Sequence, residues 1–131
     1  TTGQPFVKHW MHVGLVAYEG TKMSKSLGNL VFVHDLLTRA PAGAVRLAML
    51  GHHYREDWEW HDGDLDAGLA RYSRWVQTLG GSSGSGALEA ARAALDEDLN
   101  TPAALSAIDA AAAAGEDVSA AALLLGVSLS A

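Results

Sequence analysis

Cysteine is absent from this 131-residue chain, and that absence removes several kinds of chemistry. Without a thiol the chain can form no disulfide, no thiolate zinc site and no cysteine nucleophile of its own. Long apolar stretches are missing too, since no run approaches the roughly 18 apolar residues that span a bilayer. Hydrophobic residues still make up 49% of the chain, which predicts a globular protein. We therefore expect a cytoplasmic protein with no membrane partner.

Positive charge is scarce. The chain has 9 Lys and Arg residues against 15 Asp and Glu residues, and its formal net charge is −6. Such a surface binds polyanions poorly, so tRNA is not an expected partner and any phosphate site must be local. Lysine occurs only at Lys8, Lys22 and Lys25. The last two lie together in the polar stretch EGTKMSKSLGN, residues 19–29.

The composition of residues 19–29 is that of a phosphate-binding loop. Lys22 and Lys25 supply compact charges, while Ser24, Ser26 and backbone N–H groups supply directed donors. The flanking glycines allow such a loop to close over a nucleotide and reopen. The residues alone leave one alternative open, a solvated hairpin tip that carries two ordinary lysines.

Short strands are predicted on both sides of this loop. Residues 9–18 alternate in the manner of an extended chain. Glu19 and Gly20 form a turn signal, and the β-branched and aromatic run at residues 30–33 favours a further strand.

Helices are predicted for the rest of the chain, so the fold class is mainly α. Asp35 is expected to cap or begin a short helix that Pro41 ends. Apolar residues at helical spacing predict a helix that includes Val45 to Tyr54 and another over 65–79.

The C-terminal part is rich in alanine, which favours helix but buries little surface. Helices are predicted at 87–99, from Thr101 onward and at 118–125. Thr101 is the expected N-cap of the second, with Pro102 at its first position, and Gly126 is expected to stop the third. The stretch GGSSGSG, residues 80–86, has a linker composition and is equally consistent with a plain surface loop or a hinge.

Several conspicuous side chains have ordinary explanations. His9 and His12 have no third ligand nearby, so we expect no metal site in this chain. His52 and His53 are expected to pack at a helix end or lie on the surface, because adjacent helical positions point about 100° apart. Trp58 and Trp60 are assigned to packing rather than to a sugar platform, and Arg55 and Asp57 to an ion pair.

Residues 22–26, KMSKS, are identical to a signature of class I aminoacyl-tRNA synthetases. The surrounding HWMHVGLVAYEGTKMSKSLGN and the later DEDLNTPAAL (96–105) resemble the cysteinyl-tRNA synthetase branch of that family. Within the branch, LGHHYREDWEWHDGDLDAGLARYSRW (50–75) and LLLGVSL (123–129) resemble the amide-forming ligases of mycothiol biosynthesis. The resemblance covers nearly the whole chain.

This resemblance implies roles for the loop residues. Lys22 and Lys25 would be catalytic, holding the phosphates of ATP and stabilising the transition state. Met23, Ser24 and Ser26 would shape the ATP-binding loop, with Met23 near the adenine. Gly28 would permit its close turn and Asn29 would fix its shape.

The resemblance also implies a reaction and a domain plan. Cysteine and ATP would form cysteinyl-adenylate, and the amine of glucosaminyl-inositol would displace AMP. Residues 1–34 would form the C-terminal end of the Rossmann-type catalytic domain, with the KMSKS loop. Residues 35–79 would form a connecting helical region, 80–86 a Gly/Ser linker, and 87–131 a C-terminal helical lobe.

The family's HIGH motif and its zinc ligands belong to an upstream half that would be this chain's partner. The chain alone is therefore expected to be inactive, with zinc held elsewhere in the longer protein. A cysteinyl-tRNA synthetase and a non-catalytic helical interaction module remain the alternatives.

Overall fold

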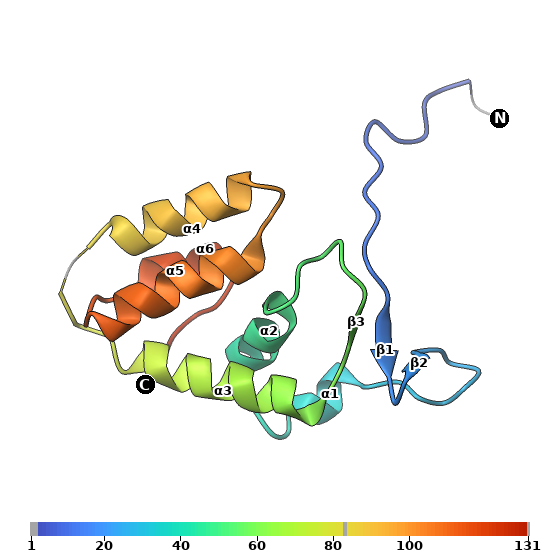
Figure 1. Ribbon diagram of the computed structural model, residues 1–131, viewed down its shortest axis with the longest axis horizontal. Helices are drawn as coiled ribbons and strands as arrows, with labels where there is room; N and C mark the ends of the chain where they lie inside the picture. Colours follow the sequence, from blue (N-terminus) through green and yellow to red (C-terminus); the bar gives the residue numbers. More distant parts are fainter. Residues whose placement is uncertain (1–2, 83, 131) are drawn as a thin grey trace.

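The computed structural model describes residues 3–82 and 84–130. Most of the regular structure is helical, and a small sheet lies at one end of the molecule (Figure 1), as the mainly α fold class predicts. Within these ranges no helix combines the length and apolarity needed to cross a membrane. The elements in chain order are β1 (Val16–Tyr18), β2 (Thr21–Lys22), α1 (Val33–Leu36), α2 (Ala42–Leu50), β3 (Trp58–Glu59), α3 (Asp62–Val76), α4 (Gly86–Asp96), α5 (Thr101–Ala113) and α6 (Ser119–Leu124).

β1 is the central strand of the sheet, whose order is β2-β1-β3. It forms an antiparallel hairpin with β2, in which Ala17 lies opposite Lys22. It pairs in parallel with β3, in which Val16 lies opposite Trp58. Because β1 has a neighbour on each side, no edge of it remains for another strand.

The strand expected at residues 30–33 is wrong. Phe32 is instead the N-cap of α1, and Leu36 N–H bonds to its carbonyl oxygen at 3.3 Å. The helix therefore begins two residues before Asp35, which lies in its first turn. The β-branched residues of 30–33 favour a strand only locally. They have no place beside β1, because β2 and β3 already pair with both of its sides.

α2 is shorter than the sequence pattern predicts. It ends at Leu50, so Tyr54 lies outside it. Gly51, a poor helix former, follows, and the chain turns toward the sheet, where Tyr54 O accepts from Gly14 N–H at 2.8 Å. The short helix that Pro41 is expected to end stops earlier, since α1 ends at Leu36, and Pro41 is instead the N-cap of α2.

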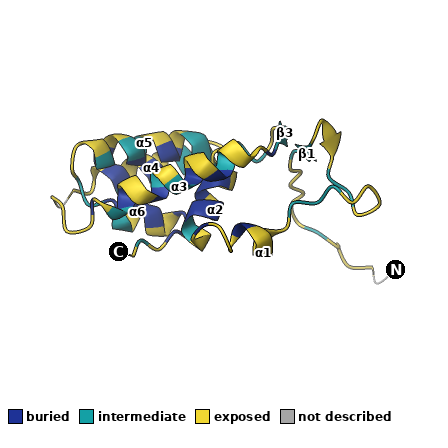
Figure 2. Cartoon of the chain, turned by 90° about the horizontal axis from the view of Figure 1, so that it is seen from below, coloured by how far each residue is buried: buried dark blue, intermediate teal, exposed yellow. Residues whose placement is uncertain are grey.

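The core lies where α2 packs on α3 and where α4 packs on α5 and α6. Figure 2 shows buried positions along the facing sides of these helices and exposed positions along the N-terminal segment. Trp75 of α3 and Leu47 of α2 are fully buried, and so are Leu105 and Ile108 of α5. The sheet is thus attached to a helical core through β3 and α3.

The C-terminal helices largely follow the prediction. α4 ends at Asp96 rather than at residue 99. Asn100, not Thr101, is the N-cap of α5, because its Oδ1 accepts from Ala103 N–H at 3.1 Å; Thr101 is then the first helical residue. The predicted stop at Gly126 is confirmed, since this glycine has φ +73° directly after the C-cap of α6.

Residues 80–82 fold back on the segment after α5. Ser82 N–H bonds to Gly115 O at 3.2 Å, and Asp117 N–H bonds to Ser82 O at 3.0 Å. The remainder of the predicted linker includes residue 83, which lies outside the described residues, and Gly86 already belongs to α4. The division of the chain into four parts stays a prediction.

Candidate functional site

The lysine-bearing loop leaves the sheet at the end of β2 and returns at Asn29. Figure 1 shows it projecting beyond β2, away from the helices. The hairpin turn before it places Glu19 at φ 53° and Gly20 at φ 72°, the left-handed pair of a tight two-residue turn. The loop is therefore carried by a short hairpin rather than by a helix.

Asn29 ties the two ends of the loop together. Its Oδ1 accepts from Ser24 N–H at 2.9 Å, while its Nδ2 donates to Thr21 O at 3.4 Å and to Lys22 O at 3.3 Å. Within the loop, Ser24 Oγ lies 3.2 Å from Ser26 Oγ. These bonds give a polar loop a defined base although it has little apolar surface to bury.

Both lysines of the loop point into solvent. Lys22 and Lys25 are exposed, and among the described residues neither forms an ion pair. Met23, between them, is half-buried and packs against the core, so it is turned away from the two charges. Two exposed cations in one loop, without carboxylate partners among the described residues, can bind an anion.

Gly28 closes the far end of the loop. Its φ of 69° lies in the left-handed region that favours glycine, and its N–H bonds to Lys25 O at 3.3 Å. A side chain at this position would meet open space, so backbone conformation rather than crowding selects glycine here.

Two carboxylates of the β3 segment bond to the backbone on either side of β1, and sequence reasoning missed both roles. Asp57 Oδ1 accepts from Leu15 N–H at 2.6 Å. Glu59 Oε1 accepts from Gly20 N–H at 2.6 Å. A shallow groove beside them is lined by Lys22 and by Leu15, Ala17, Asp57, Trp58 and Glu59. The only signal in the sequence was their spacing of two in an extended stretch.

The expected ion pair between Arg55 and Asp57 is wrong. Arg55 instead binds Asp98 through Nε at 2.9 Å and through a terminal nitrogen at 2.7 Å. Tyr54 donates its hydroxyl to the same carboxylate at 2.6 Å. The hydrogen bonds from Arg55 and then from Tyr54 lower the pKa of Asp98 to about 2. This cluster joins the loop before β3 to the turn between α4 and α5.

The aromatic and histidine residues have the packing roles that the sequence predicts. Trp60 is 4% exposed and belongs to the core. The ring of His52 stacks on Trp58 with centroids 3.8 Å apart, and its Nε2 lies 3.2 Å from Asp64 Oδ1. His53 Nε2 lies 3.1 Å from Asp98 O.

A metal site does not fit the described part of the chain. No group of three or more His, Cys, Asp or Glu side chains there is arranged to hold an ion. Zinc would therefore need ligands from elsewhere in a longer protein.

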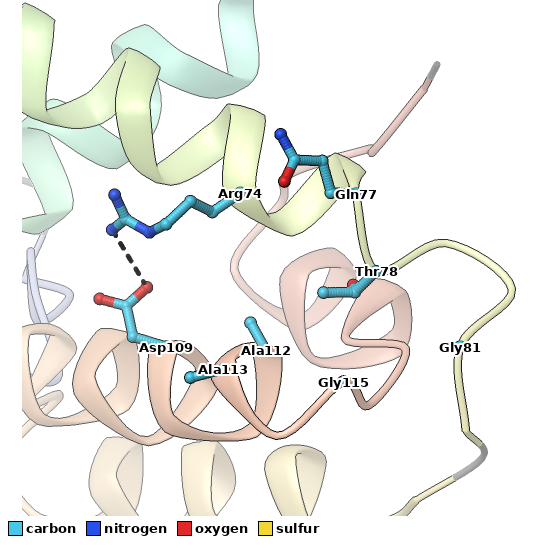
Figure 3. Close-up of a pocket in the computed structure, with 8 residues that line it drawn as sticks. All are labelled: Arg74, Gln77, Thr78, Gly81, Asp109, Ala112, Ala113 and Gly115. Atoms are coloured by element: carbon cyan, nitrogen blue, oxygen red, sulfur yellow. Dashed lines mark ion pairs between the residues drawn. The ribbon is translucent and has the colours of Figure 1, made fainter.

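A second pocket lies between α3 and α5 and carries a different kind of chemistry. Figure 3 shows Arg74 directed at Asp109 across it, with a terminal nitrogen 3.9 Å from Oδ1. The same carboxylate accepts from Arg71 Nε at 3.0 Å and from Trp75 Nε1 at 2.8 Å. Asp109 is thus occupied by bonds that join the two helices, and we assign this pocket to packing.

Known proteins resemble the chain over most of its length. Residues 1–70 match the family described as "tRNA synthetases class I (C) catalytic domain". A Thermobispora bispora protein named L-cysteine:1D-myo-inositol 2-amino-2-deoxy-alpha-D-glucopyranoside ligase is 48% identical over 140 residues, which cover 98% of this chain and 35% of the relative. Ligases of the same name from Nocardiopsis dassonvillei and Acidothermus cellulolyticus are 54% and 50% identical, covering 83% and 82% of this chain.

The chain spans about a third or less of the length of these relatives, since the shares covered are 35%, 28% and 28%. The family match covers the whole sheet, the lysine loop, α1, α2 and the first half of α3. The chain therefore belongs to the family of the class I (C) tRNA synthetase catalytic domain.

Proposed function

We propose that this chain is part of an ATP-dependent ligase of mycothiol biosynthesis, which activates cysteine and joins it to the amine of glucosaminyl-inositol. The observation that carries this proposal is the exposed KMSKS loop, with two cations free of carboxylate partners among the described residues. The names of relatives that are 48–54% identical supply the two substrates. With ATP as the energy source, a cytoplasmic location is part of the proposal.

The proposed reaction has two steps. A carboxylate oxygen of cysteine attacks the α-phosphorus of ATP, the bond from that phosphorus to the bridging oxygen breaks, and pyrophosphate leaves. The amine nitrogen of the aminosugar then attacks the carbonyl carbon of cysteinyl-adenylate. The bond to the phosphate oxygen breaks, AMP leaves, and the nitrogen loses a proton as the amide forms.

The loop residues contribute to the first step. Lys22 and Lys25 bind the phosphates and stabilise the negative charge that builds on the departing pyrophosphate. Ser24 and Ser26 present hydroxyl donors beside them, and Met23 fastens the loop to the core near the adenine side. Gly28 and Asn29 set the shape of the loop. When bound to the whole protein, zinc would hold the cysteine thiol.

The test uses the whole protein that contains this chain. ATP and cysteine are supplied with either glucosaminyl-inositol or cysteine tRNA, and products are identified by mass. We expect the cysteinyl amide of the aminosugar, AMP and pyrophosphate, with no charged tRNA.

A cysteinyl-tRNA synthetase is the second candidate, because the matching family is described by tRNA synthetases. Charged tRNA in the same assay would establish it in place of the ligase. The net charge of −6 favours the ligase, since tRNA binding calls for a basic surface. No product with either acceptor would indicate a non-catalytic helical module.

A further inference from the structure

Two carboxylates hold β1 at its two ends. Asp57, just before β3, and Glu59, at its end, are two residues apart, so their side chains leave the extended chain on the same side. Asp57 accepts from the N–H of Leu15, which precedes β1, and Glu59 accepts from the N–H of Gly20, which follows it. Hydrogen bonds to an ionised carboxylate are stronger than those between neutral groups.

The Glu59 bond acts on the turn that leads into the lysine loop. Glu19 at φ 53° adopts a left-handed conformation that disfavours residues with a side chain. The bond from Gly20 N–H to Glu59 Oε1 offsets part of that cost and fixes the direction of the turn.

The direction of this turn sets the position of Lys22, two residues further on. Lys22 pairs with Ala17 across the hairpin, and its carbonyl oxygen accepts from Asn29 at the base of the loop. Lys22 and Glu59 also line the same shallow groove. A displacement at Gly20 would therefore be passed to the loop.

Glu59 is itself held by the helical core. Trp58 N–H bonds to Leu15 O at 3.0 Å and Trp60 N–H bonds to Ala17 O at 2.9 Å, which fixes the backbone on both sides of it. Trp60, the next residue, is buried in the core, and α3 begins two residues later. The Glu59 carboxylate thus connects the turn before the glycine-flanked lysine loop to a strand that is anchored in the helical core.

Resting on the proposed function, we infer that Glu59 is a positioning residue for ATP. Its carboxylate holds the Gly20 turn so that Lys22 meets the phosphates, and it does not itself touch the substrate.

The test compares Glu59→Ala with Glu59→Gln in the whole protein, by ATP–pyrophosphate exchange. Glu59→Ala should lower kcat/KM for ATP about tenfold, the scale of one lost hydrogen bond to a charged group. Glu59→Gln keeps an acceptor oxygen and should remain within about threefold of the unaltered protein. The KM for cysteine should not change in either variant.

Glu56→Ala is the matched control. Glu56 is an exposed glutamate three residues away, and its side chain makes no hydrogen bond to the described residues. It should leave the kinetics unaltered, and all three variants should keep the unfolding temperature of the parent to within a few degrees. An unchanged kcat/KM for ATP in Glu59→Ala overturns the inference. So does a loss in Glu59→Gln as large as that in Glu59→Ala, because an acceptor oxygen for the Gly20 N–H would then not be what the turn requires.

Amide hydrogen exchange separates this inference from the proposed function. Glu59→Ala should speed exchange at the Gly20 amide, whereas Lys25→Ala should not, whatever reaction the protein catalyses. Unchanged exchange at Gly20 shows that the bond does not hold the turn. If Glu59→Ala speeds exchange at Gly20 but the unaltered protein makes no adenylate, the hydrogen bond between Gly20 and Glu59 is confirmed and its role in positioning ATP is refuted.

Discussion

Lys22 and Lys25 differ in how firmly their backbones are held. Lys22 belongs to β2 and is paired with Ala17, whereas Lys25 lies in the turn that Gly28 closes. Lys25 can therefore move with the loop while Lys22 stays at its base. In the proposed reaction, a mobile cation meets the charge that appears only as pyrophosphate departs.

Lys25→Ala should slow adenylate formation about 100-fold, the scale of removing one donor that stabilises developing charge. The affinity for cysteine should change little, because the role proposed for Lys25 is to bind the phosphates of ATP. Pyrophosphate exchange measures the rate and calorimetry measures cysteine binding. Lys8→Ala, which alters an exposed lysine of the N-terminal segment, is the control. Equal losses of rate and of cysteine affinity would rule out the assignment.

Asp98 is a residue whose charge matters to stability. Its folded pKa of about 2 lies below that of an unfolded aspartate, so ionised Asp98 favours the folded state. This stabilisation is fully present at pH values above the pKa of an unfolded aspartate, about 4, and is lost as the pH falls toward the pKa of Asp98 in the folded protein. Its half-exposed side chain reduces the size of the effect through solvent screening.

Asp98→Asn should therefore destabilise the protein at neutral pH, and the difference from the unaltered protein should shrink between about pH 4 and pH 2. Asparagine tolerates the left-handed backbone that Asp98 adopts at φ 55°, so the change removes charge without adding backbone strain. Urea unfolding at several pH values measures the difference. A difference that is constant with pH would show that the carboxylate charge is not responsible.

At the scale of elements, Gly68 lets α2 and α3 cross closely. A Cβ at Gly68 would collide with the backbone of α2, at Ala44 O and, 2.8 Å away, at Ala48 N. Backbone atoms inside a helix cannot move aside as a flexible side chain can. The two helices are thus as close as glycine permits.

Gly68→Ala should destabilise the protein by about 1–3 kcal/mol, the usual cost of overpacking. Gly63→Ala in the same helix is the matched control, because a Cβ there would meet nothing within 4 Å. Alanine is the better helix former, but Gly63 lies in the first turn of α3, so the control should not destabilise the protein and should gain less than about 1 kcal/mol. Urea unfolding of both variants tests the pair, and shifts of the same sign would contradict the close crossing.

The helices could be predicted from sequence where local periodicity decides the structure, as in α3, α5 and the stop at Gly126. Prediction erred where a distant partner decides it. Residues 30–33 have strand propensity, but β1 is already paired on both sides. β3 was not predicted as a strand, because its partner lies about forty residues earlier and two residues carry too little pattern.

Some residues of the candidate site could likewise be predicted from the sequence, and others could not. The loop from Lys22 to Asn29 is visible in the sequence because its residues are contiguous. The roles of Asp57 and Glu59 are not, since they depend on which backbone N–H groups the strand pairing brings near. The predicted Arg55–Asp57 ion pair is wrong because Arg55 forms a bidentate interaction with the carboxylate of Asp98, 43 residues away.

The whole molecule has an apolar N-terminal segment that leaves the body of the protein. Figure 1 shows this segment extending from β1 away from the helices. Phe6 is 93% exposed and Trp10 73% exposed, and Met11 and Val13 are exposed as well. Several large apolar side chains gathered on one strand-like segment mark a surface that associates with other surfaces.

The chain alone should therefore self-associate, and Trp10→Ser combined with Val13→Ser should reduce the association. Sedimentation velocity over a range of concentrations measures it. Leu123→Ser, which alters one of the two exposed leucines of α6, is the control and should have little effect. A monomer at every concentration, or an equal effect of the control, would contradict this expectation.

Parallel pairing of β1 with β3 sets an order of events in folding. The carboxylate bonds that accompany it join residues 42 and 39 positions apart, so forming them directly from an open chain would require closing a long loop. α2 and α3 lie within or next to that interval, and the residues they bring together, such as Ala44 and Gly68, are closer in sequence than those that the carboxylate bonds join. We expect α2 and α3 to pack first and so bring β3 to β1. The lysine loop would then be among the last parts of the chain to take its final shape.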